Sequence, residues 1–224
     1  MKTIKLLVAM LALCVATTAS AQLTKEQLKA RKEMKKASRA ELNEKASKAA
    51  RKEAKALKKE GWKANPGALP LDKQLDRSYM MQNDYDEDMF PKYIMGEARS
   101  VGENYDGAKM QAMELAKQNL AGQIQTEVTA LIESNVANKQ MSAEDAATVT
   151  NSVMSSKALI SQSITRTMPV VEVYRELPNK NKEVLVRLAY SSKLAKEAAK
   201  QAIREDLEKQ GQTQQDKLDK MLGW

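Results

Sequence analysis

Apolar residues recur at every fourth position between Tyr105 and Val136. The row has no break and comprises Ala108, Ala112, Ala116, Leu120, Ile124, Val128, Ile132 and Val136. Four further apolar residues widen the row into a face: Met113, Leu115, Ala121 and Leu131. This spacing predicts an amphipathic helix long enough to form the spine of a domain. The alanines at its start would let a neighbouring element approach closely.

A second helical pattern follows a polar corner at residues 138–142. Ser142 and Asp145 stand at the spacing of a capping box, with Asp at its fourth position. The apolar stripe behind them is narrower and comprises Ala146, Val149, Val153, Ile160 and Ile164. Because only a short corner separates the two patterns, we expect an antiparallel helical hairpin.

The hydrophobic period then changes from near four to two. In 170–177, Val171 and Val173 point away from their polar neighbours, and 183–190 alternates in the same way. The apolar positions of this second run are Val184, Val186, Leu188 and Tyr190. A polar turn at 178–182 joins the two runs, so the pattern predicts a β-hairpin.

Two further elements flank these segments. A first strand is predicted at 92–100, between Pro91 and Gly102. Ser192 is expected to cap a last helix that ends at Gly211. The apolar residues of that helix are Ala195, Ala199, Ile203 and Leu207.

The order strand, long helix, helix, strand, strand, helix predicts an α+β domain at 92–210. Its simplest form is a small, antiparallel-containing three-stranded sheet. The helical hairpin and the C-terminal helix would cover one face, while the edge taken by the first strand stays open. Two sets of charged residues are candidates for pairing across a sheet face, Glu97 with Arg99 and Glu172 with Arg175.

The N-terminus has the form of a secretory signal peptide. Lys2 and Lys5 precede a short apolar run, and Ala19-Ser20-Ala21 forms an Ala-x-Ala cleavage site. Residues 1–21 are therefore expected to direct export and to be removed. At the other end, residues 211–224 are expected to form a flexible tail.

Composition excludes several kinds of chemistry. Cys14 is the only cysteine and lies in the signal segment, and the chain has no histidine. Disulfides, thiol chemistry, histidine-based nucleophiles and imidazole metal sites are thus excluded from the mature chain. Leu13 stands where a lipoprotein signal has a small residue, which argues against lipid attachment. With one Phe and two Trp the chain has few stacking platforms, which argues against nucleic acid as a partner. We predict no catalytic, cofactor-binding or metal-binding residues.

A strongly basic segment, residues 22–60, follows the signal peptide. It carries 14 Lys/Arg against 6 Asp/Glu, whereas residues 61–224 carry 21 basic and 23 acidic side chains. High helix propensity and the capping-box residues Thr24 and Gln27 predict a basic helix that Gly61 ends. Its apolar residues are sparse, so this helix is expected to be polar almost all round.

Two interpretations of this basic arm stay open. It is either a charged, solvated helix without a specific partner, or a surface that contacts anionic lipid headgroups or an anionic envelope polymer. In the second case the candidate contacts are its cationic residues: Lys29, Arg31, Lys32, Lys35, Lys36, Arg39, Lys48, Arg51, Lys52, Lys55, Lys58 and Lys59.

Residues 61–91 predict a turn-rich linker with one short helix and an acidic loop at 83–88. Asp84, Asp86 and Asp88 alternate as in a calcium loop, but the glycine of the sharp turn and the bidentate glutamate are missing. A solvated loop, or one that docks against the basic arm, is therefore favoured, and cation binding stays open.

The strand and helix motifs together resemble a bacterial envelope domain. They comprise Tyr93-Ile-Met-Gly-Glu-Ala-Arg99, then Tyr105 with Ala108, Ala112 and Ala116, and finally Val184-Leu-Val-Arg-Leu-Ala-Tyr190. This pattern, over residues 92–208, is similar to a domain of small outer-membrane lipoproteins and of the N-terminus of the flagellar T-ring assembly protein. The whole chain also resembles exported Gram-negative proteins with the same basic arm. The resemblance implies a non-enzymatic envelope role and no defined ligand. The long second helix and the missing lipobox cysteine depart from the lipoproteins, so lipid anchoring is not carried over.

We therefore expect an exported protein, periplasmic or associated with the outer membrane, that has no enzymatic activity. It would act as an interaction or structural module, with an envelope protein as partner of the domain and an anionic surface as partner of the arm. Two other classes stay open. One is a periplasmic carrier or sensor that holds a small ligand between sheet and helices. The other is a carboxylate-based hydrolase, which needs two acidic groups converging in a cleft. The partner's identity and the oligomeric state are not predicted.

Overall fold

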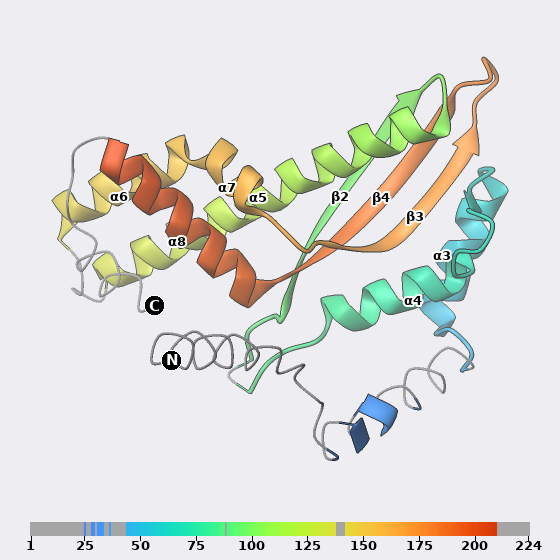
Figure 1. Cartoon of the computed structure of the whole chain (residues 1–224), viewed down its shortest axis with the longest axis horizontal. Helices are drawn as coiled ribbons and strands as arrows, with labels where there is room; N and C mark the ends of the chain where they lie inside the picture. The colour runs from blue at the N-terminus through green and yellow to red at the C-terminus, as the bar shows by residue number, and fades with distance from the viewer. Residues whose placement is uncertain are drawn as a thin grey trace, which may run out of the picture. The chain divides into compact units, whose positions relative to one another are not determined.

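A computed structural model describes residues 44–87, 89–137 and 142–209, together with 25, 28–29, 31–33 and 36 (Figure 1). Several predicted features lie outside the described residues: the signal peptide, the arm's capping box, most of the corner at 138–142, Gly211 and the tail. The chain divides into two units, Met1–Lys45 and Ala46–Trp224. The sheet and the helices that cover it belong to the second unit.

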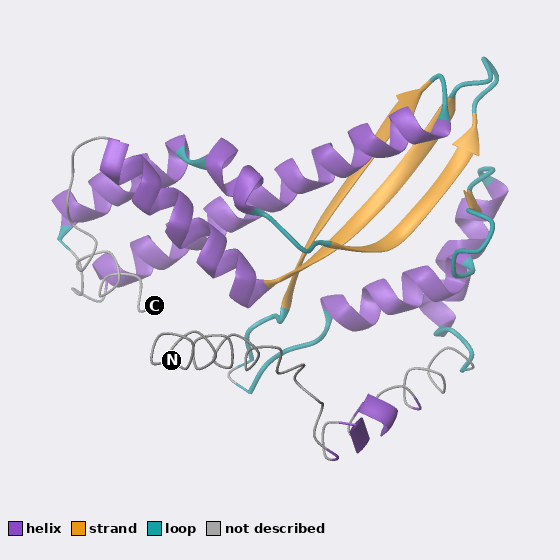
Figure 2. Cartoon of the chain, in the orientation of Figure 1, coloured by secondary structure: helices purple, strands orange, loops and turns teal. Residues whose placement is uncertain are grey.

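The second unit has the predicted α+β architecture (Figure 2). Its elements in chain order are α3 (Lys48–Lys59), β1 (Lys63–Ala64), α4 (Leu71–Gln82), β2 (Tyr93–Gly102), α5 (Tyr105–Ala137), α6 (Ala143–Ser155), α7 (Lys157–Ser163), β3 (Met168–Glu176), β4 (Lys182–Ser191) and α8 (Ser192–Lys209).

The sheet has four antiparallel strands in the order β1-β3-β4-β2, so the prediction of three strands is wrong. The extra strand is β1, which pairs Lys63 with Tyr174 and Ala64 with Val173 of β3. Two residues are too few to show an alternating pattern, which explains why this strand escaped prediction. The predicted hairpin is present, and β2 takes the edge beside β4.

Helix α5 covers one face of the sheet, over β2 and β4. Seven of the eight residues in the predicted apolar row are buried, with Ala108, Ala112 and Ala116 fully enclosed. The helix approaches β2 closely at Gly96, where an added Cβ would lie 2.4 Å from the Ala116 carbonyl oxygen. The small residues of helix and strand therefore fix the distance between them.

The predicted second helix is divided in two at Ser156. All five residues of its apolar stripe are buried, as the spacing predicts: Ala146, Val149, Val153, Ile160 and Ile164. Ser156 is itself buried, and its hydroxyl donates to the Ser152 carbonyl oxygen of the preceding turn. Such back-bonding by serine bends helices, which gives a physical reason for the break between α6 and α7. Both pieces pack against α5 and α8.

The opposite face of the sheet is covered by α4, which packs against α3 (Figure 2). A second core lies between these helices and the sheet, and it contains Ala46, Ala50, Ala54, Trp62, Leu71, Leu75, Val171, Val173 and Leu185. The prediction that helices cover one face is therefore wrong. The short helix predicted within residues 61–91 is present as α4, and it packs on the sheet. Strands β3 and β4 carry apolar side chains on both faces, and both faces must be removed from water.

Charged residues on this second face pair across neighbouring strands. Glu97 binds Arg187 of β4 at 2.6 Å, and Arg175 binds Glu183 at 2.6 Å, each pair lying directly opposite in the ladder. Of the four predicted charged residues, Glu97 and Arg175 thus form cross-strand pairs, but with partners on β4. Glu172 binds Lys109 of α5 instead, and Arg99 lies over the Trp62 ring. The cap predicted at Ser192 is replaced by another contact, since its hydroxyl donates to the Pro91 carbonyl oxygen at 2.6 Å.

Replacing the glycine at the close approach should strongly destabilise the fold. We expect Gly96→Ala to lower the free energy of unfolding by about 3 kcal/mol, because the added carbon meets backbone that cannot move aside. Urea denaturation followed by circular dichroism measures the change. Gly122→Ala is the matched control, since the nearest atom to its added carbon is the Lys157 Nζ at 3.7 Å. That variant should be more stable by about 0.5–1 kcal/mol, as for glycine in a helix interior. Equal stability of the two variants would contradict the close approach.

Candidate anionic-surface site on helix α3

Helix α3 begins and ends at residues suited to those positions. The Ser47 hydroxyl accepts a hydrogen bond from the Ala50 amide at 3.2 Å, and Gly61 follows the helix with φ +89°. The Ser47 amide donates to the Asp76 carboxylate of α4 at 2.9 Å, which ties the start of α3 to its neighbour. Residues 44–47 are not helical, so the prediction of one continuous helix through the arm is wrong.

The two faces of α3 have opposite character. Ala50 and Ala54 are 0% and 2% exposed, and they pack in the core against α4 and the sheet. Six exposed cations occupy the other face: Lys48, Arg51, Lys52, Lys55, Lys58 and Lys59. At 100° per residue these six fall within about 120° of the helix circumference. This half of the arm is amphipathic, with alanine as its apolar residue, and is not polar all round as predicted.

A groove of about 420 Å³ runs beside this basic face. Arg51, Lys55, Lys58 and Lys59 line it, with Ala54 below and Asp72 of α4 at the other wall. Among the residues that the structure describes, no carboxylate forms an ion pair with any of the six cations of α3. The groove therefore has four cations against the one carboxylate of Asp72, which leaves a net positive charge held on a fixed helix.

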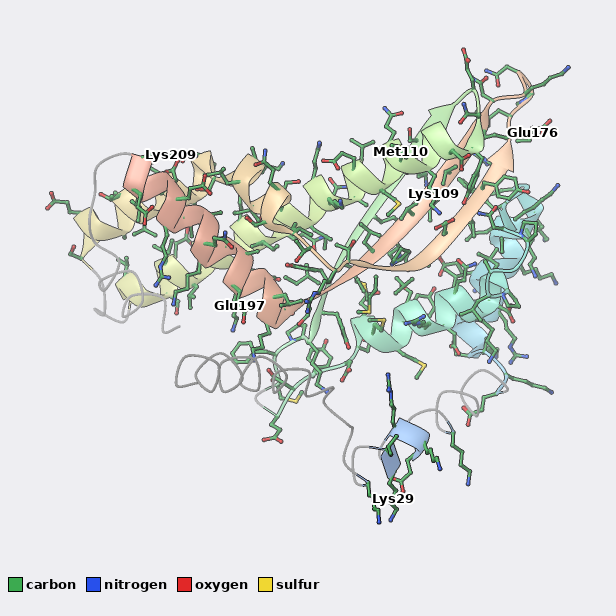
Figure 3. All side chains as sticks on the ribbon, viewed as in Figure 1. Lys29, Lys109, Met110, Glu176, Glu197 and Lys209 are labelled. Atoms are coloured by element: carbon green, nitrogen blue, oxygen red, sulfur yellow. The ribbon has the colours of Figure 1, made fainter. Side chains whose placement is uncertain are left out.

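The remaining predicted contacts lie elsewhere in the chain. Lys29, Arg31, Lys32 and Lys36 are exposed and belong to the first unit, and Figure 3 labels Lys29. Lys35 and Arg39 lie outside the described residues. The structure thus brings together six of the twelve predicted cations, all on α3.

Trp62, which the sequence analysis did not single out, anchors the end of α3. It is 1% exposed, and two guanidinium groups lie over its ring, that of Arg175 at 4.7 Å and that of Arg99 at 5.5 Å from the centroid. Its indole N–H donates to the Glu60 carboxylate at 3.3 Å. Cation–π contacts of this kind contribute about 0.5–2 kcal/mol each. A single Trp just after a helix-ending glycine was the only sequence signal.

A polar cluster on the α5 face of the sheet is the other candidate site. Glu172 of β3 accepts hydrogen bonds from Lys109 at 2.8 Å, from Asn65 at 3.2 Å and from the Tyr105 hydroxyl (Figure 3 labels Lys109). Asn65 also donates to the Tyr105 hydroxyl, and Tyr105 packs edge-on against Tyr174. The cluster joins the 61–91 segment, α5 and β3.

The protonation of this cluster favours a structural role. Burial raises the pKa of Glu172. The hydrogen bonds from Lys109 and Tyr105 and the charge of Lys109 together lower this pKa by more than burial raises it, so the pKa lies below its usual value. Burial, and then Glu172 as hydrogen-bond partner, raise the pKa of Tyr105. A saturated carboxylate with a lowered pKa is a weak general base, and a hydrolase needs a second converging carboxylate.

The acidic loop folds on itself and not against the basic arm residues of α3. Asp84 binds Lys92 at 2.8 Å, and the Asp86 carboxylate accepts from the Phe90 amide at 2.8 Å. Asp88 lies outside the described residues. Over the described part of the chain, no three Asp or Glu side chains gather in an arrangement that could hold a metal ion.

The cavity between α5 and α8, lined by Ile124, Val128 and Ala195, measures about 40 Å³. Ligand sites usually measure roughly 300–1,000 Å³, so this cavity is too small for a ligand, and the carrier hypothesis stays a prediction. Of the described helices, none has the length and apolar character needed to cross a membrane.

Comparison of the chain with protein-family models, curated proteins and solved structures finds no match. The likeness to the envelope lipoproteins and the T-ring protein therefore stays a prediction. The class that fold and site define is an α+β domain that carries a rigid basic helix.

The Glu172 cluster should make stability depend on pH. Because the folded pKa of Glu172 is lowered, its contribution is present above the unfolded value near 4.5 and is lost as pH falls through the folded value. We expect Glu172→Gln to cost about 1–3 kcal/mol at pH 7, with the difference from wild type shrinking toward pH 3.

Urea denaturation of both proteins across this pH range measures the difference. Glu103→Gln, at an exposed glutamate, is the control and should show no such trend. A difference for Glu172→Gln that is the same at pH 3 and pH 7 would contradict the lowered pKa.

Proposed function

We propose that the protein is an exported, non-enzymatic module of the cell envelope whose helix α3 binds an anionic surface. The observation that carries this proposal is the separation of faces on α3. Alanines fix one face to the folded unit, while six cations on the other face have no acidic partner among the described residues. The export and the envelope location rest on the predicted signal peptide.

The magnitude of the attraction supports a reversible surface contact. A Lys or Arg near an anionic membrane contributes about 1 kcal/mol, and the contribution falls off within a Debye length of roughly 8 Å at physiological salt. Six cations on one rigid stripe can approach a flat surface together without losing backbone entropy, because the helix is already ordered by its packing. The groove beside Lys55 and Lys59 offers a place for a phosphate or carboxylate group.

While α3 holds the domain at the anionic layer, the remaining surface of the domain would bind a protein partner of the envelope. Deleting the whole arm is a poor test, because removal of Ala50 and Ala54 would expose the second core. Surface substitutions on α3 avoid this difficulty.

The test is sedimentation of the mature chain, residues 22–224, with vesicles, so that the apolar run of the signal segment takes no part. Wild type should bind vesicles that contain anionic phospholipid and should not bind neutral ones, and added salt should weaken the binding. The triple variant Lys52→Gln, Lys55→Gln, Lys59→Gln should partition roughly 100-fold less, since it loses about 3 kcal/mol. A parallel arm with a soluble anionic polysaccharide separates lipid from envelope polymer.

A matched control removes the same charge elsewhere. Lys157→Gln, Lys193→Gln, Lys196→Gln changes three exposed lysines of α7 and α8 and should bind nearly as well as wild type. Equal loss in both triple variants would show that only net charge matters, and α3 would not be the site. Binding of wild type to neither vesicles nor polysaccharide would overturn the proposal.

A further inference from the structure

Strand β2 forms a long edge of the sheet. It spans ten residues, and among the described strands it pairs with β4 alone. The Asn119 side chain donates to the Glu97 carbonyl oxygen at 2.7 Å, so the backbone groups of Glu97 point away from β4. Those of Met95, Arg99 and Val101 point the same way, because direction alternates along a strand. A row of donors and acceptors of this kind is a template for another strand.

The side chains along this edge are complementary to those of a second, antiparallel copy of β2. Reading outward from Ala98, Glu97 on one side matches Arg99 on the other, and Met95 matches Val101. An antiparallel copy centred on Ala98 would therefore place each carboxylate opposite a guanidinium and each apolar side chain opposite another. Arg187 binds only the Oε2 atom of Glu97, which leaves the other oxygen as an acceptor. Val101 is 47% exposed, so its apolar side chain is available to a second copy.

Helix α5 adds an apolar residue at the same level. Gln111 accepts a hydrogen bond from Ser100 at 2.6 Å, and Asn119 reaches Glu97 as described. Leu115 lies four residues from each on the same helix face, so it is level with Ala98 and faces the edge of β2. Leu115 is 36% exposed. An exposed leucine between two amides that bind the edge strand marks the centre of the complementary segment.

Space for a neighbour exists along this edge. A groove of about 630 Å³ opens beside Met95 and Glu97, and α5 forms its other wall with Asn119, Gly122 and Thr126. Gly122 lacks a side chain at this wall, which leaves room for groups from a second molecule.

We propose that the protein forms a homodimer by antiparallel pairing of two β2 edges about a two-fold axis through Ala98. The Arg99 N–H of each copy donates to the Glu97 carbonyl oxygen of the other, which accepts through its second lone pair beside Asn119. The Glu97 carboxylate and the Arg99 guanidinium of opposite copies form an ion pair. The two four-stranded sheets become one continuous sheet, and Leu115 of one copy contacts Leu115 of the other. This pairing does not depend on the proposed function of α3.

The first test is the mass of the full chain in solution. Wild type should have the mass of two chains by light scattering and dissociate on dilution. Leu115→Asp places two carboxylates at the axis, and Arg99→Glu opposes like charges in the ladder, so both variants should have the mass of one chain at the same concentration. Met110→Asp is the matched control on the same helix, since Met110 is 74% exposed on another face (Figure 3) and should leave the dimer intact.

The second test is the register of the ladder. In a chain with Cys14→Ser, Ala98→Cys should form a disulfide between copies under mild oxidation, because residues at the axis lie about 4.5–5.5 Å apart. Val101→Cys should not, since the two copies of this position would be roughly 20 Å apart at 3.3 Å per residue. Leu115→Cys, at an exposed helix position, serves as a second axis probe if Ala98→Cys does not fold.

Three results would overturn the proposal. One is a wild-type chain that stays monomeric at high concentration, as when another segment of the chain covers β2. Another is a dimer that Leu115→Asp and Arg99→Glu leave intact. The third is cross-linking at Val101 with none at either axis position, which would show a different register.

Discussion

The close approach of helix α5 to strand β2 is the constraint on which the rest of the structure depends. Gly96 has no Cβ, and Ala108, Ala112 and Ala116 have nothing beyond theirs, so helix and strand backbones lie almost in contact. Leu120 still lies against Gly96, whereas Ile124 and Ile132, farther along α5, belong to the core that α6, α7 and α8 complete. The side chains on the buried face of α5 thus increase in size along the helix, from alanine where it approaches β2 to isoleucine where it packs against other helices.

The apolar side chains on the other face of the sheet are covered by a different part of the chain. Val171, Val173 and Leu185 need cover, and the chain provides it with the segment before β2. The two buried residues of α3, Ala50 and Ala54, are both alanines, so the helix can pack closely against its neighbours. Half of the positions of the same helix carry lysine or arginine. Packing and charge are thus linked on α3, because the residues that fix its orientation also determine which way its cations point.

The sequence predicted those parts whose pattern is long and periodic. The row on α5, the stripe of α6 and α7 and the hairpin of β3 and β4 were all found, because each repeats over several turns or residues. Strand β1 has two residues and no period, and the alanine face of α3 resembles a helix rich in good helix formers. The partners of Glu172 come from segments far apart in sequence, Asn65 and Lys109, which local pattern cannot connect. Six of the twelve candidate cations lie on one face of α3, but the core beneath them was missed.

The position of Trp62 gives the molecule an internal optical reporter. The indole is buried, with the guanidinium groups of Arg175 and Arg99 over its ring, and the chain has one other tryptophan, Trp224. Separation of α3 and α4 from β3 would transfer this ring from a dry, cationic environment to water. Fluorescence emission in a Trp224→Phe chain would then follow the attachment of the basic layer alone, independently of unfolding around α5.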